Sequence, residues 1–241
     1  MKLLASLRHL SRRSILAAVF AVLALGALIP ATAFAASPTA TKCAANDTQC
    51  FITLGDQLIS ARQASLNTLS GKVTDRLNQQ LISSDDANVL QADITTNEQG
   101  LTALQNKLNG ETSASAAKQD VQNIFFQFRI YAVVLPRDYR RLYLDVARTV
   151  DAKLRGLAPQ LQDAIKEAPT SEQQQLQSLY NDYIAQLGTA EGQFDAAAAD
   201  IVALTPENFN YNRSTYESTL ASLKTSMQTI HKALHQAASD V

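Results

Sequence analysis

The sequence predicts an all-α protein, an elongated antiparallel bundle of about six long amphipathic helices that follows a cleaved signal peptide. Apolar residues recur at steps of three and four over most of residues 51–234, which is the period of a helix buried along one face. The breaks between these stretches are short and polar, and no alternation typical of strands joins them. A helix with one apolar face must bury it against other helices, which favours a bundle.

Composition excludes several classes of protein. The chain has 241 residues, of which 46% are hydrophobic, enough for a sizeable core. Eight glycines and six prolines exclude collagen-like and low-complexity chains. Without the four basic residues of 1–35, 17 basic residues face 22 acidic ones, a net charge of −5. Because nucleic-acid binding depends on an excess of Lys and Arg, we expect no nucleic-acid partner.

Residues 1–35 have the three parts of a secretory signal peptide. Four basic residues and no acid lie in residues 1–13, and the run 15–29 is uncharged. Ala33-Phe34-Ala35 then supplies the small residues of a cleavage site, so we expect cleavage after Ala35. The apolar run has 15 residues, short of the roughly 20 that a spanning helix needs. These features predict a secreted or extracytoplasmic bacterial protein without membrane contact once the signal peptide is removed.

The export route stays open. Residues 11–16, Ser-Arg-Arg-Ser-Ile-Leu, resemble the twin-arginine export motif, but ordinary signal peptides also carry paired arginines. The pattern therefore fits both the twin-arginine and the general secretory route.

The segment 36–50 contains the two cysteines of the chain, Cys43 and Cys50, with six residues between them. In an oxidising compartment two cysteines this close are expected to pair, so the sequence predicts a disulfide. Redox motifs have two intervening residues, and no histidine lies nearby to complete a metal site.

Three helices are predicted in the first half of the bundle. The first covers about 51–81 and the second ends at Asn109-Gly110, a sequence typical of helix C-termini. The third runs from Ser113 to Leu135, where Pro136 is expected to stop it. Phe125, Phe128, Tyr131 and Leu135 share one face of this third helix, and we expect them in the core.

Three more helices are predicted in the second half. The fourth starts at Arg137 and should kink or break near Gly156 and Pro159. The fifth opens at Pro169-Thr170-Ser171, and Thr205-Pro206 separates it from the sixth. The bundle, 51–241, is predicted as one continuous body, with two subdomains at 51–135 and 137–241 as the alternative.

Part of the chain resembles a known group of proteins. The matching stretches are Gly55–Arg62 with Leu66–Leu69, Gly100–Leu104, and Phe128–Pro136, whose Arg-aliphatic-Tyr-to-Pro stretch is the most specific. They resemble a group of uncharacterised secreted helical proteins of bacteria. The resemblance covers about residues 51–165 and implies export and helicity; it implies no catalytic activity.

Arginines interleave with tyrosines around the predicted corner at Pro136. The arginines are Arg129, Arg137, Arg140, Arg141 and Arg148, and the tyrosines are Tyr131, Tyr139 and Tyr143. One interpretation is structural: Arg129 caps helix carbonyls or pairs with Asp138 or Asp145, while Arg140 and Arg141 are exposed. The other is a contact for an anionic ligand or a partner, made by Arg137, Arg140 and Arg141.

No pattern predicts catalysis. The sequence lacks a nucleophile elbow and a Gly-rich phosphate loop, and we expect no catalytic residue and no cofactor. His231 and His235 lie four residues apart on the last predicted helix, but no third ligand can be named beside them. We therefore expect no metal site.

These observations predict an exported, non-enzymatic helical bundle with a structural or protein-interaction role at the cell envelope or outside the cell. Its partner would be a protein or an envelope component. The alternative is a bundle that binds a small ligand or a metal.

Overall fold

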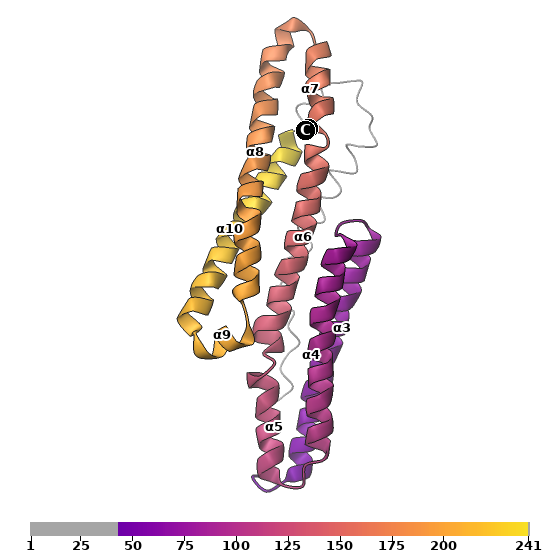
Figure 1. Cartoon of the computed structure of the whole chain (residues 1–241), viewed down its shortest axis with the longest axis vertical. Coiled ribbons are helices and arrows are strands. Elements are labelled where there is room, and N and C mark those ends of the chain that lie inside the picture. The colour runs from indigo at the N-terminus through magenta and orange to yellow at the C-terminus, as the bar shows by residue number, and fades with distance from the viewer. Residues whose placement is uncertain (1–42, 241) are drawn as a thin grey trace. The chain divides into compact units, whose positions relative to one another are not determined.

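The computed structural model describes residues 43–240, and every regular element within them is helical (Figure 1). The predicted all-α class is confirmed. The predicted signal peptide and its cleavage after Ala35 lie outside the described residues. Within 43–240, no helix combines the length and the apolar character needed to cross a membrane.

The described residues form two compact units. The first unit comprises 43–142 and 203–217, and the second comprises 143–202 and 218–240. The division falls inside two helices, α6 (Leu135–Arg155) and α10 (Arg213–Asp240), and not at Pro136.

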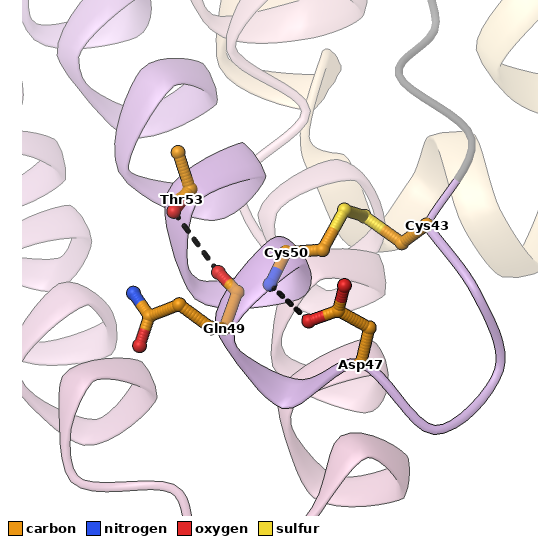
Figure 2. The surroundings of a disulfide bond; sticks show 5 residues. All are labelled: Cys43, Asp47, Gln49, Cys50 and Thr53. Atoms are coloured by element: carbon orange, nitrogen blue, oxygen red, sulfur yellow. Dashed lines mark hydrogen bonds between the residues drawn. A yellow bond between two sulfur atoms is a disulfide. The ribbon is translucent and has the colours of Figure 1, made fainter.

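A disulfide joins Cys43 and Cys50 just before and within the first turn of α3 (Thr48–Asn78), as predicted (Figure 2). The two Cα atoms are 5.6 Å apart, which is within the usual range for such a bond. Between the cysteines, Asp47 caps the helix because its carboxylate accepts a hydrogen bond from the Cys50 amide at 2.9 Å. The bond and the cap together hold the start of α3.

The first unit is built on α3, α4 (Ser84–Asn109) and α5 (Ala114–Phe126), which all pack against one another (Figure 1). Polar pairs show that α3 and α4 are antiparallel: Ser70 bonds Gln91 near one end, and Gln105 bonds Asp56 near the other. The apolar positions predicted for the second helix are all buried, namely Leu90, Ile94, Leu101, Leu104 and Leu108. Ser83 caps α4 by accepting a hydrogen bond from the Asp86 amide.

The first predicted helix, 51–81, ends three residues early, at Asn78. Gln80 adopts a left-handed conformation with φ 55°, while the Leu81 amide donates to the Arg76 carbonyl and the Gln80 amide to that of Leu77. These two bonds are the Schellman pattern that closes a helix end. Glycine is the usual residue at a left-handed helix end. Because position 80 is a glutamine, no local sequence signal marks the end of α3.

The third predicted helix, Ser113–Leu135, is wrong in its second half. Ser113 caps α5 as a start signal, but α5 ends at Phe126 and Arg129 turns left-handed at φ 47° and ψ 35°. A π-helical turn, η1 (Ile130–Val134), then leads directly into α6. Pro136 does not stop a helix; it lies in the first turn of α6.

This break shifts the helical phase, so the predicted core face is only partly correct. Leu135 is buried, but Phe128 and Tyr131 are half-buried and Phe125 is 42% exposed. Phe125 and Tyr131 instead lie against the guanidinium of Arg62, which is buried and donates to the Leu58 carbonyl at 2.8 Å. Burial lowers the pKa of Arg62.

The second unit contains most of α6, then α7 (Ala158–Glu167), α8 (Thr170–Ala203) and most of α10. The predicted break near Gly156 and Pro159 is confirmed, since α6 ends at Arg155 and α7 begins at Ala158. Tyr183 of α8 is fully buried, and its hydroxyl donates to the Leu154 carbonyl beside this break. That carbonyl also accepts from the Leu157 amide at 2.9 Å. The predicted apolar positions of the fourth helix are all buried, namely Leu142, Val146, Val150, Leu154, Leu157, Leu161 and Ile165.

Candidate functional site

Arg129, at the junction between α5 and η1, has a left-handed backbone conformation. Its left-handed backbone is unfavourable for any residue that carries a Cβ, by roughly 1 kcal/mol or more. Such backbone strain and π-helical turns are both enriched at functional sites. The surroundings of Arg129 are therefore the first place to look for a site.

Two aromatic rings contact the Arg129 guanidinium. Its central carbon lies 4.8 Å from the ring centroid of Phe126 and 4.8 Å from that of Phe209. Phe209 belongs to α9 (Pro206–Tyr211), a short helix that contacts η1. These distances are those of cation–π contacts, which hold the side chain between the end of α5 and α9.

The side-chain amide of Asn210 makes two hydrogen bonds at the same junction. Its nitrogen donates to the Phe126 carbonyl at 2.7 Å, and its oxygen accepts from Arg129 Nε at 2.8 Å. The Phe126 carbonyl is among those that a helix leaves without an internal partner. The Asn210 side chain of α9 thus caps the C-terminus of α5 and also orients the Arg129 side chain.

An open pocket of about 850 Å³ lies at this junction. Its lining residues come from 123–129 and 205–211, all in the first unit: Asn123, Phe126, Gln127, Arg129, Thr205, Pro206, Glu207, Asn210 and Tyr211. We call it the Arg129 pocket. Phe126 is 57% exposed and Tyr211 is 81% exposed, so two large aromatic rings at this pocket face solvent.

Several polar groups that line the Arg129 pocket are not used in the fold. Within residues 43–240, the side chains of Gln127, Glu207 and Tyr211 make no hydrogen bond or ion pair. Arg129 is bonded through Nε alone and pairs with no acid there. The pocket therefore presents an amide, a carboxylate, a phenol and the end of a guanidinium to a ligand.

A second arginine supports α9 from the side. The Arg213 guanidinium lies 4.0 Å from the Phe209 ring centroid and bonds Glu217 at 2.6 Å. Phe209 also packs edge-on against Tyr216, with centroids 5.0 Å apart. Arg213 does not line the pocket, but it contacts the same Phe209 ring as Arg129.

The three arginines predicted to contact an anionic ligand or partner are held by contacts inside the first unit. Arg137 Nε lies 2.7 Å from Asp138, and Arg141 Nη1 lies 3.0 Å from Asp93. Arg140 donates to the Pro136 carbonyl at 2.8 Å. Arg140 and Arg141 are half-buried, so the expectation that they are exposed is wrong, because their guanidinium groups bond Pro136 and Asp93 within the first unit. Their role toward a ligand stays a prediction.

Asp138 is fully buried, and burial raises its pKa although Arg137 acts in the opposite direction. Below the raised pKa the folded state binds a proton that the unfolded state does not, so acidification removes an unfavourable buried charge. Asp138→Asn cannot titrate. We therefore expect wild type to gain stability relative to Asp138→Asn as pH falls from 7 toward the ordinary aspartate pKa near 4. Urea unfolding of both proteins across this range measures the difference, and a constant difference would contradict the assignment.

His231 and His235 lie on α10 with ring centroids 6.3 Å apart. Within the described part of the chain, no group of three or more His, Cys, Asp or Glu side chains is placed to hold a metal. The absence of a metal site at His231 and His235 stays a prediction.

Sequence reading missed α9 and with it the Arg129 pocket. Thr205-Pro206 was interpreted only as a break, yet Thr205 caps α9 by accepting from the Asn208 amide at 3.1 Å. A threonine before a proline is also a helix-start signal, and residues 205–206 carry it. The hydrogen bonds of Phe126 and Arg129 with Asn210 join positions more than 80 residues apart. No local sequence pattern predicts such a contact.

Comparisons of this chain with protein-family models, with curated proteins and with solved structures found no match. The resemblance to secreted helical proteins of bacteria therefore stays an expectation.

Proposed function

We propose that this chain is an exported, non-enzymatic helical protein that acts by binding a protein or envelope partner through the Arg129 pocket. One observation carries the proposal: Phe126 and Tyr211 expose large rings beside polar groups that the fold leaves unused. Exposed aromatic side chains next to an arginine are typical of the residues that dominate binding interfaces. Export is supported by the signal-peptide pattern of 1–35 and by the disulfide.

The alternative, a bundle that encloses a small ligand in its core, has less support. Small-molecule sites bury most of the ligand in a largely apolar cavity. The Arg129 pocket is open and mixed in polarity, and it lies where α5 ends. Such a surface fits a segment of a larger partner better than an enclosed small molecule.

A photo-crosslinking experiment tests this function. The photoreactive amino acid benzoylphenylalanine replaces Tyr211 in one protein and Val89, an exposed residue of α4, in the control. After irradiation of exporting cells, we expect a discrete adduct from position 211 and none from 89, because only 211 borders the pocket. The adduct should disappear when Phe126→Ala is added. Equal labelling from both positions, or none from 211, would contradict a binding role for the pocket.

A further inference from the structure

We propose that the Arg129 pocket recognises a carboxylate carried on a peptide segment, and that the Arg129 guanidinium binds this carboxylate. The inference rests on the proposed binding function and adds the chemistry of the ligand. It follows from three features of the pocket: an arginine without an acid partner, the way that arginine is held, and the polar groups around it.

Arg129 differs from most arginines of the described chain in having no carboxylate oxygen within 4.0 Å. Arg137, Arg141, Arg148, Arg155 and Arg213 all lie within 4.0 Å of an Asp or Glu oxygen. Arg129 borders an open pocket, and within 43–240 its two terminal nitrogens make no hydrogen bond. A guanidinium stays charged at any physiological pH, so a ligand oxygen is the missing partner that this charge would favour.

The position of Arg129 is set before any ligand arrives. The rings of Phe126 and Phe209 both lie in cation–π contact with its guanidinium, and Nε donates to Asn210. Because Nε already donates to Asn210, only the terminal nitrogens Nη1 and Nη2 can bind a ligand, and they present two parallel N–H groups. Two oxygens of one carboxylate match this edge. Because the side chain is already ordered, binding costs little further conformational entropy.

The charge around the pocket favours a carboxylate over a phosphate. Sites for phosphorylated ligands usually gather several arginines, whereas one arginine lines this pocket and Glu207 lines it too. A dianion would meet one positive and one negative side chain. A carboxylate carries a single charge that Arg129 alone can balance, and Glu207 is left to accept a hydrogen bond from an N–H group of the same ligand.

The remaining lining residues fit a peptide chain. The Gln127 amide can both donate and accept, which suits the alternating N–H and C=O groups of a backbone. Phe126 and Tyr211 offer exposed rings on which an apolar side chain beside the carboxylate can pack. The expected ligand is therefore a short segment with an acidic group next to an apolar or aromatic side chain.

Panning a random peptide library on the disulfide-bonded chain tests the proposal. We expect enriched peptides to share an acidic group next to an apolar side chain. Synthetic versions with that acid changed to its amide should bind at least about tenfold more weakly, as should the original peptides to Arg129→Gln. Arg129→Lys should also bind more weakly, because lysine keeps the charge but not the two parallel donors. Arg76→Gln, on α3 and outside the pocket lining, should bind like wild type, and thermal melts of every variant verify folding.

The outcomes separate this proposal from the proposed function. Peptides that bind at the pocket, as shown by loss of binding in Tyr211→Ala, but that need neither an acid nor Arg129 would overturn the carboxylate assignment and leave the binding role intact. Displacement of the peptides by equimolar inorganic phosphate would also overturn it, in favour of a phosphate ligand. Peptides that bind Tyr211→Ala and Arg129→Gln as well as wild type, or a library that yields no enrichment, would count against both proposals.

Discussion

Tyr183→Ala is expected to lower the free energy of unfolding by about 3–5 kcal/mol, the usual cost of deleting a buried aromatic ring. Tyr183 has no exposed surface and is among the largest fully buried side chains. Its removal opens a cavity where α8 packs on the end of α6, and it also takes away the hydroxyl that bonds the Leu154 carbonyl. Urea denaturation followed by circular dichroism measures the change.

Two further variants separate the ring from the hydroxyl. Tyr183→Phe keeps the packing and loses one hydrogen bond, so we expect a loss of about 1 kcal/mol. Tyr211→Ala removes a tyrosine that is 81% exposed and should change stability by no more than about 0.5 kcal/mol. A Tyr183→Ala loss as small as that of Tyr211→Ala would show that α8 does not pack as described.

Gly55→Val should destabilise the first unit by about 3 kcal/mol through overpacking. A Cβ atom at Gly55 would lie 2.1 Å from Leu108 Cδ2 and 3.3 Å from Val121 Cγ2. Leu108 is fully buried and cannot swing into solvent, so α4 or α5 has to move away from α3. Thermal and urea unfolding of the variant test this expectation.

Gly71→Val is the matched control on the same helix. Nothing lies within 4 Å of a Cβ built at Gly71, and valine has a slightly better helix propensity than glycine. We expect a change within about 0.5 kcal/mol. If both valine variants lost the same stability, the cause would be helix propensity or chain entropy and the close packing at Gly55 would be refuted.

The spacing of apolar residues correctly predicted those parts of the fold in which a helix buries one face. The stop at Asn109, the break near Pro159 and the apolar positions of α4, α6 and α7 are all as expected. Each of these follows from signals within a few residues of one another, which is the range over which pattern reasoning works.

Close tertiary contacts explain what periodicity missed. At Gly100 of α4, a Cβ atom would lie 2.5 Å from Phe128 Cε1. The glycine thus leaves space for a ring that lies 28 residues further along the chain. The left-handed Arg129 likewise depends on contacts with Phe209 and Asn210. Interactions between distant segments override local preference at both positions.

The disulfide has a consequence for how the chain acquires its covalent structure. With two cysteines in the chain, Cys43 and Cys50, only one intramolecular pairing exists, so an oxidant has no wrong bond to make and no isomerase is needed to correct one. The bond spans seven positions in sequence. Its formation therefore requires only that a short segment reach an oxidising compartment, and oxidation can precede the folding of α4 and every later helix.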